Sequence, residues 1–190
     1  KAAQEMADSV EKMMSVRPRS VSTFHSFCVR VLREDIASLG RGFDGKFVIY
    51  DQTDSRKAIK DILKRFNLDH READDALRTI SKAKQKYRGS IVEYIASLPY
   101  PHDRYAEVAD TYQKDLEKSN ALDYDDLIYF ATHLFAGKPD TLAKWQDRYD
   151  FFMVDEFQDT NEIQYFLIRL LASRNSNNVF VGGERLETVW

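Results

Sequence analysis

Residues 149–160 read Tyr-Asp-Phe-Phe-Met-Val-Asp-Glu-Phe-Gln-Asp-Thr, and this stretch decides the fold class. Its apolar run Phe151–Val154 ends abruptly in Asp155 and Glu156. Such a run predicts a strand buried in a parallel sheet, where both faces are covered. Ligands of α/β sheets bind outside the carboxyl ends of these strands. In a nucleotide-hydrolysing site, Asp155 would hold Mg²⁺ through water, and Glu156 would orient or deprotonate the attacking water. The simpler alternative is a strand that runs into an acidic loop.

The segments on either side of this strand predict an α/β fold. We expect an amphipathic helix at 161–172 and a second buried strand at Val179–Val181, followed by a Gly-Gly pair. Nearer the start of the chain, a short strand is expected at Ser20–Phe24 and a helix at His25–Leu39. Strands that alternate with helices at both ends of the chain indicate a parallel sheet.

The middle of the chain has a different character. Glycines at positions 40, 42 and 45 mark a boundary. Beyond them, Phe47–Tyr50 is the one segment with any strand character, and Asp51 is expected to cap a helix. Further helices are expected at Asp74–Tyr87, Ser90–Leu98 and Tyr105–Leu116. We therefore expect an all-helical insertion at 40–119, between a first part of the α/β domain at 1–39 and the rest of it at 120–190.

The composition is that of a globular protein without a global basic field. The chain has 190 residues, of which 31% are charged and 43% hydrophobic, and its formal net charge is −3. Any nucleic-acid binding must therefore come from a local patch. The single cysteine, Cys28, excludes a disulfide within the chain and makes a reducing, cytoplasmic setting the expectation. No apolar run approaches the roughly 18 residues of a membrane span, and no signal peptide is visible.

The stretch Val154–Thr160, with Asn161 after it and Gln164 three residues further, resembles the Walker B box of the UvrD/Rep family of superfamily 1 DNA helicases. The family's form is Val-Asp-Glu-(Tyr/Phe)-Gln-Asp-Thr-Asn, followed by that Gln. The resemblance implies that Asp155 binds Mg²⁺ through water and that Glu156 is catalytic. It also implies that Gln158 takes part in sensing ATP.

Thr23-Phe24-His25-Ser26, at the expected start of a helix, is the first candidate DNA contact. Hydroxyls and backbone amides at a helix start suit contact with phosphate, although simple capping of the helix by Thr23 is the alternative. The segment and the helix after it resemble the family's motif Ib. The resemblance implies that Thr23 and His25 contact the phosphates of single-stranded DNA. Upstream, Lys1–Met6 resembles the tail of motif Ia.

A basic cluster and an acidic box complete the central motifs. Lys82, Lys84, Lys86 and Arg88 form the one dense basic cluster, which is either a solvated surface or a contact with the DNA backbone. Its surroundings resemble the family's 1B subdomain, which implies DNA contact by Lys82 and Lys84. The acidic box Leu122–Leu127 is similar to a family box before Walker B. We interpret it as a helix start, which the helix dipole favours.

The last segment, Phe180–Trp190, resembles motif III with two departures. Glu184 stands where the family has Asp, and Glu187 stands where relatives have a Gln that senses the γ-phosphate. A carboxylate at that point repels phosphate, which puts ATP sensing through Glu187 in doubt. The resemblance implies that Trp190 stacks on a DNA base, whereas the alternative is an ordinary core aromatic.

Together the resemblances imply part of a RecA-like (P-loop NTPase) parallel sheet interrupted by the helical 1B insertion. The implied whole protein is an ATP-dependent helicase or translocase. It would use ATP and Mg²⁺ and act on single-stranded DNA and single-strand/double-strand junctions. The family's usual polarity is 3′ to 5′, and its members repair, replicate or recombine DNA. No membrane role is implied, and a bacterial member would be cytoplasmic and associated with the nucleoid.

The phosphate-binding loop Gly-x-x-x-x-Gly-Lys-(Ser/Thr) does not occur in this sequence. Both ends read as cut from something longer, and the chain alone is expected to hydrolyse ATP negligibly. Three alternatives stay open. One is the helicase subunit of an AddA/RecB-type helicase-nuclease. Another is a helicase-derived DNA-binding module that does not hydrolyse ATP, which Glu187 favours. The third is an unrelated α/β protein.

Overall fold

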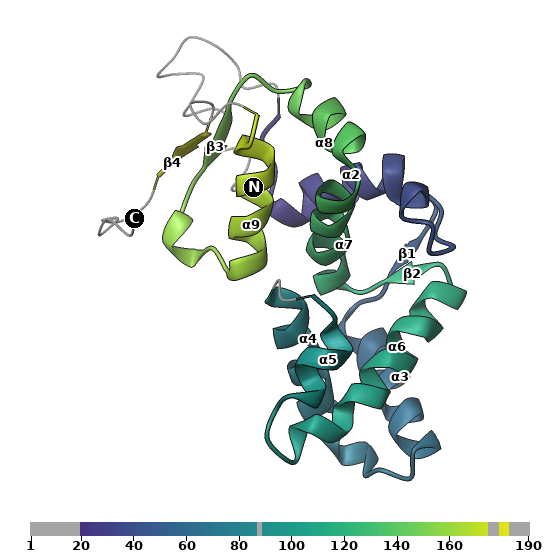
Figure 1. Ribbon diagram of the computed structural model, residues 1–190. Coiled ribbons are helices and arrows are strands. Elements are labelled where there is room, and N and C mark those ends of the chain that lie inside the picture. Colours follow the sequence, from purple (N-terminus) through teal and green to yellow (C-terminus); the bar gives the residue numbers. More distant parts are fainter. Residues whose placement is uncertain (1–19, 87–88, 175–178, 183–190) are drawn as a thin grey trace.

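The computed structural model describes residues 20–86, 89–174 and 179–182 and shows a mostly helical α/β structure with two small parallel sheets (Figure 1). Among these residues, no helix is both long and apolar enough to cross a membrane. The helices are α2 (Phe24–Asp35), α3 (Gln52–Arg65), α4 (Ala73–Gln85), α5 (Ile91–Ala96), α6 (Tyr105–Lys118), α7 (Tyr124–Gly137), α8 (Pro139–Gln146) and α9 (Glu162–Ala172). The strands are β1 (Val48–Ile49), β2 (Ala121–Leu122), β3 (Phe152–Val154) and β4 (Val179–Val181). Short 3₁₀ turns lie at Ile36–Leu39, His70–Glu72, His102–Arg104 and Phe157–Asp159.

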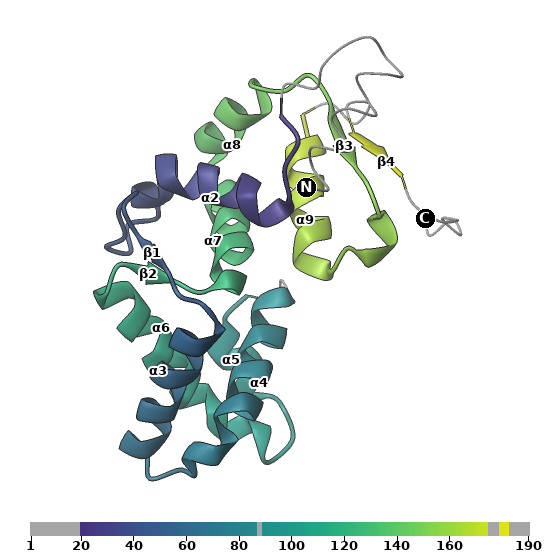
Figure 2. The same cartoon turned by 180° about the vertical axis from the view of Figure 1, so that it is seen from behind.

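Helix α7 is the centre of the first of two hydrophobic cores. It is apolar on most of its surface, as expected for a helix surrounded by others, and it packs against both α2 and α9. Leu127, Phe130 and Leu134 of α7 are at most 1% exposed. Side chains from α2, α8 and α9 join them, including the buried Trp145 and Leu167. In both views these helices form one end of the molecule, beside β3 and β4 (Figures 1 and 2).

The second core lies among α3, α4, α5 and α6, which form the other end of the molecule (Figure 2). Each helix contributes one apolar stripe, as the helical periodicity predicts. Ile59 and Leu63 come from α3, Ile80 from α4, Ile95 from α5 and Tyr112 from α6. The expected helices of the middle segment are therefore present. Asp51 caps α3 as predicted, because its carboxylate accepts a hydrogen bond from the Asp54 amide at 2.8 Å.

A two-stranded parallel ladder connects the beginning and the end of the helical block. Val48 in β1 pairs with Ala121 in β2, and Ile49 pairs with Leu122. The strand character of Phe47–Tyr50 is thus confirmed, whereas β2 was not predicted from the sequence. A strand of only two residues carries too short a pattern to be recognised from periodicity.

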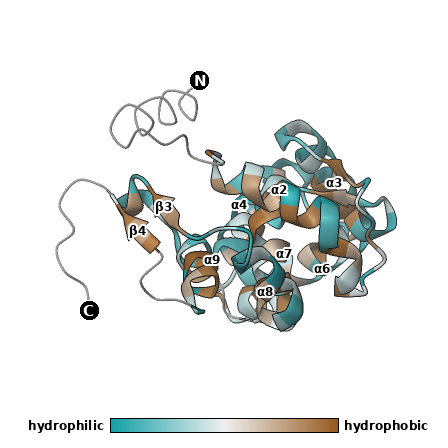
Figure 3. Cartoon of the chain, turned by 90° about the horizontal axis from the view of Figure 1, so that it is seen from above, coloured by the Kyte–Doolittle hydropathy of each residue, from teal (hydrophilic) through white to brown (hydrophobic). Residues whose placement is uncertain are grey.

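Strands β3 and β4 pair in parallel, with Met153 opposite Phe180. Both strands were predicted, but their predicted burial is wrong: Met153 is 64% exposed and Phe180 55% exposed. Successive side chains of a strand point to opposite faces. Phe152 packs against the first core, and no described element covers the side chains of Phe151, Met153 and Phe180. Figure 3 shows these apolar strands at the edge of the helical pack.

The predicted strand at Ser20–Phe24 is also wrong. Residues 20–23 form no strand, and α2 already begins at Phe24. The Thr23 side chain accepts a hydrogen bond from the Ser26 amide, so the local polar groups favour the helix start. Further along, Pro139 occupies the first position of α8, where its missing N–H costs no helical hydrogen bond.

Candidate functional site

The carboxyl end of β3 presents both predicted carboxylates on the surface. Asp155 and Glu156 follow directly after Val154, and both are exposed. The end of β4 runs beside them, because the Gly182 amide donates to the Val154 carbonyl at 2.8 Å. A Cβ atom on Gly182 would lie 3.6 Å from Asp155 Oδ1, so the backbone directly after β4 lies against this carboxylate.

Glu156 has an unusual backbone conformation. Its φ of 50° and ψ of 45° lie in the left-handed region, which a residue other than glycine rarely adopts. The following 3₁₀ turn, Phe157–Asp159, is joined to β4 by a hydrogen bond from the Phe157 amide to the Gly182 carbonyl. This turn brings the Gln158 amide group to the Glu156 carboxylate, to which it donates a hydrogen bond. Strained backbone of this kind concentrates at functional sites, which makes Glu156 a candidate functional residue.

The donor set at this strand end suits Mg²⁺. Protein sites for this ion usually supply one or two carboxylates, while waters and substrate phosphates complete the octahedron. Asp155 and Glu156 provide two adjacent carboxylates in reach of solvent. In the described part of the chain no cluster of three acidic, histidine or cysteine ligands forms a complete protein cage. The arrangement therefore fits an ion shared with a phosphate ligand, and the metal role of Asp155 stays a prediction.

The start of α2 holds the first pair of candidate DNA contacts. Thr23 is exposed, and its Oγ1 accepts a hydrogen bond of 3.2 Å from the Ser26 amide while its hydroxyl donates to Ser26 Oγ at 3.1 Å. The capping interpretation of Thr23 is thus confirmed. Contact with DNA phosphates stays a prediction for this residue.

His25 is half-buried and stacks on an aromatic ring that the sequence did not single out. The centroids of its imidazole and the Tyr124 ring lie 4.1 Å apart, with an interplanar angle of 31°. Burial lowers the pKa of His25 below its ordinary value, although the nearby Asp125 carboxylate partly offsets this effect. Tyr124 is 60% exposed. The available signal was Tyr124 itself, an aromatic residue between two acidic residues at a helix start. Packing in the core does not explain an aromatic side chain at such a position.

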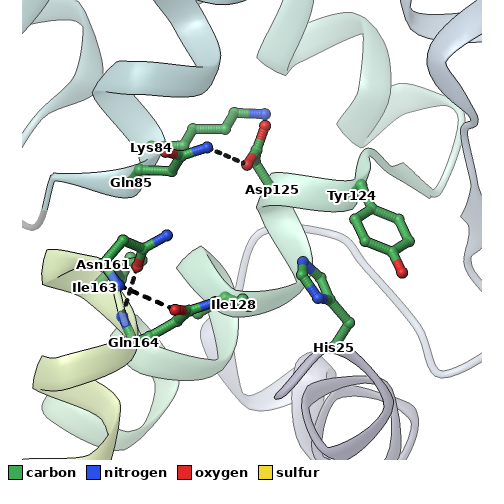
Figure 4. A pocket seen from close by; sticks show the side chains of 9 residues that line it. All are labelled: His25, Lys84, Gln85, Tyr124, Asp125, Ile128, Asn161, Ile163 and Gln164. Atoms are coloured by element: carbon green, nitrogen blue, oxygen red, sulfur yellow. Dashed lines mark hydrogen bonds between the residues drawn. The ribbon is translucent and has the colours of Figure 1, made fainter. Parts of the chain in front are cut away.

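A cavity of about 260 Å³ lies between His25 and the segment that follows Glu156 (Figure 4). Its lining comes from α2, α4, α7 and the start of α9, where Asn161 and Gln164 form a reciprocal capping box. Figure 4 shows His25 and Tyr124 on one side and the Asn161–Gln164 pair on another. The candidate DNA contact His25 therefore shares one cavity with the start of α9, which follows the Asp155–Thr160 segment in the chain.

The two candidate lysines of α4 have opposite environments. Lys82 is exposed, in keeping with the prediction of a basic surface. Lys84 is only 1% exposed, so its predicted position on the surface and direct contact with DNA are wrong. Its Nζ lies 2.7 Å from Asp123 Oδ2 and 2.7 Å from Asp126 Oδ1. Helical spacing explains the burial, because Lys84 follows Ile80 by four residues and shares its inward face.

The remaining candidates lie outside the described residues. These are Glu187 and Trp190, with Glu184 beside them, and the segment Lys1–Met6. Their predicted roles in ATP sensing and DNA stacking therefore stay predictions.

Comparison with known proteins defines the class. A sequence model of the UvrD/REP helicase N-terminal domain matches residues 1–185. The chain therefore belongs to the UvrD/Rep helicase family, as the motifs around Asp155 and His25 predicted.

Individual relatives agree with this assignment. The chain is 37% identical over 186 residues to the ATP-dependent DNA helicase PcrA of Staphylococcus aureus, a match that covers 96% of the chain. It is also 37% identical over 186 residues to the PcrA helicase of Staphylococcus epidermidis. In both cases the chain spans 25% of the length of the relative.

Proposed function

We propose that this chain is part of an ATP-dependent DNA helicase that moves along single-stranded DNA. The observation that carries the proposal is the short segment of chain that connects two sites. The exposed carboxylates Asp155 and Glu156 end a parallel strand, and the segment after them lines the same cavity as His25 and Tyr124. A motor can use such a connection, because the state of the nucleotide must change the grip on DNA.

The two hydrophobic cores support the proposed domain organisation. The first core takes most of its residues from both flanks of the helical block, together with Phe43 and Phe47 at the beginning of the block. The second core takes its residues from the block itself, with Ala121 directly after it. We assign residues 1–39 and 120–190 to a RecA-like domain and residues 40–119 to an inserted helical subdomain. The β1–β2 ladder lies where the chain leaves the first part and returns to it.

On the nucleotide side, the chain's own residues would act as follows. Asp155 would hold Mg²⁺ through water, and such an ion would supply positive charge for the phosphates of ATP. Glu156 orients the attacking water and accepts its proton. Gln158 keeps the Glu156 side chain in place through their hydrogen bond. Gln158 lies in the turn before α9, and its hydrogen bond joins that turn to the catalytic carboxylate. It would therefore report the state of the phosphate to this turn. Glu187 would be a second sensor only with a cation or a proton between its carboxylate and the phosphate.

On the DNA side, Thr23 and His25 contact phosphates and Tyr124 offers its exposed ring to a base. A stacked base is worth roughly 1–3 kcal/mol and gives little sequence preference, which suits a translocating protein. Trp190 adds a second stacking residue. Lys82 adds an exposed charge that makes binding weaker at high salt.

The finer properties follow the family. We propose 3′-to-5′ movement, preference for single-strand/double-strand junctions, and a cytoplasmic role in DNA repair, replication or recombination. The 190-residue chain by itself would be inactive, because it holds no phosphate-binding lysine loop.

The deciding experiment measures ATP hydrolysis by the full-length protein with and without single-stranded DNA. DNA-stimulated turnover is expected, and Glu156→Gln should lower it by at least about a hundredfold while DNA binding persists. Glu107→Gln is the matched control, since it makes the same chemical change at an exposed position of α6. A wild-type protein that binds DNA but never hydrolyses ATP would instead favour the non-hydrolysing module.

A further inference from the structure

The side chain of Lys84 lies in a buried ionic cluster where the helical block meets α7. Its Nζ donates a hydrogen bond of 2.7 Å to Asp123 Oδ2 and forms an ion pair of 2.7 Å with Asp126. Asp123 is the N-cap of α7, and its other oxygen accepts from the Asp126 amide at 2.8 Å. One ammonium group of α4 therefore binds both members of the capping box that starts α7.

The charges of this cluster depend on one another. Burial by itself would lower the pKa of Lys84, but the two carboxylates raise it above its usual value, so the lysine stays charged. Burial and the charge of Asp123 raise the pKa of Asp126. The positive charge of Lys84 lowers this pKa and so offsets part of the rise. The ammonium also lies over the ring of Tyr112 at 5.3 Å from its centroid. Removing the lysine would leave two buried carboxylates without their cation, which is strongly unfavourable.

Both carboxylates of the cluster belong to the start of α7, which also carries the exposed ring of Tyr124. Tyr124 is the first residue of α7 and follows Asp123 in the chain. A second bond reinforces the same joint, since Gln85 Nε2 donates to Asp125 Oδ1 at 3.1 Å. Figure 4 shows Lys84 and Gln85 on one side of Asp125, and Tyr124 with His25 on the other. Contacts from α4 thus hold the first turn of α7, from which Tyr124 projects against His25.

We propose that Lys84 is a positioning residue for DNA binding: through Asp123 and Asp126 it holds the start of α7 so that Tyr124 stacks on His25 and faces the DNA. The proposal rests on the proposed function. Lys84 touches no DNA itself. Through its contact with Asp123 and Asp126, the helical block influences DNA binding even where the surface of the block does not touch DNA.

A double-mutant cycle on the full-length protein tests this role, with affinity for a fluorescein-labelled oligothymidylate as the readout. Lys84→Met should weaken binding about tenfold, close to the loss expected from Tyr124→Ala, which removes one base stack. In the Tyr124→Ala background, Lys84→Met should have almost no further effect. Residues that act through one another are non-additive in this way, whereas a general loss of stability would add to the loss from Tyr124→Ala.

Two further variants complete the cycle. Lys82→Met removes one exposed charge from the same helix, and its loss should add to that of Tyr124→Ala and disappear at high salt. Lys84→Met with Asp126→Asn keeps the net charge of the cluster but loses the tether to α7. The melting temperature of this double variant should be closer to that of the wild type, and its affinity for oligothymidylate should still be low. It tests the positioning role if Lys84→Met alone does not fold.

Wild-type affinity in a folded Lys84 variant would overturn the positioning role. Full additivity of Lys84→Met with Tyr124→Ala would overturn it as well. A wild-type protein that fails to bind oligothymidylate at low salt would contradict the proposed function itself, which is a different result from either of these.

Discussion

The carboxylate of Asp35, at the end of α2, accepts a hydrogen bond of 2.7 Å from the indole Nε1 of Trp145 in α8. Trp145 is 2% exposed and packs edge-on against Phe27 at 5.7 Å between ring centroids. Lys144 donates to the same carboxylate at 2.7 Å. One acidic group thereby joins the helix that carries His25 to the helix that precedes β3.

Asp35→Ala should lower the free energy of unfolding by about 1–3 kcal/mol, because it leaves the buried indole N–H without a partner. Urea denaturation followed by circular dichroism measures the change. Glu34→Ala is the control. Its ion pairs with Lys144 and Arg148 are accessible to solvent, with side chains 37–40% exposed, so the expected loss is below about 1 kcal/mol. Equal losses for the two variants would contradict the assigned role of the indole bond.

Gly45→Ala should destabilise the joint between α2 and β1. A Cβ atom at this position would overlap the backbone carbonyl of Arg33, whose own guanidinium donates to the Gly45 carbonyl at 2.8 Å. Backbone on both sides must shift, and about 1–3 kcal/mol of stability should be lost. Gly137→Ala, in the last turn of α7 with no atom near its Cβ position, should be neutral or stabilising. A melting temperature that falls in both variants would contradict this difference.

DNA affinity should increase on acidification through His25. Because burial lowers its pKa from the ordinary 6.5, the imidazole is neutral at pH 7 and gains its positive charge only below that value. The added charge would attract phosphate. Binding of oligothymidylate, measured from pH 8 to about pH 5, should tighten at the acid end in the wild type and much less in His25→Gln. Folding stability changes in the opposite direction: the contribution of neutral His25 is complete above pH 6.5 and is lost as the pH falls through the lowered pKa.

The start of α9 depends on the reciprocal bonds between Asn161 and Gln164. The backbone amide of Gln164 donates to Asn161 Oδ1 at 3.0 Å, and the backbone amide of Asn161 donates to Gln164 Oε1 at 3.0 Å. Asn161→Ala should lower the free energy of unfolding by about 1 kcal/mol. Asn161→Ser should keep most of it, since the hydroxyl can accept the same bond. If Ser behaves like Ala, capping is not what this asparagine contributes.

The local features of the fold were predictable from the sequence. The apolar run Phe151–Val154, followed at once by Asp155, predicted β3, and capping residues such as Asp51 predicted the helix starts. These features depend on neighbours in the chain, so local periodicity and capping chemistry are sufficient to show them. The family followed from the same motifs, because their residue types and order are specific.

The surroundings of individual side chains were decided by tertiary structure. The sequence around Lys84 reads as a basic surface, yet the side chain is buried because α7, 39 residues further along, supplies two carboxylates. The stacking of His25 on Tyr124, the pairing of β1 with β2 and the exposure of Met153 likewise depend on partners distant in the chain. Sequence by itself determined the two carboxylates at the end of β3 and the capping residues that begin many of the helices, but not the place of Tyr124 beside His25. Only the tertiary structure decided which groups meet, because burial and ion pairing are properties of the packed chain.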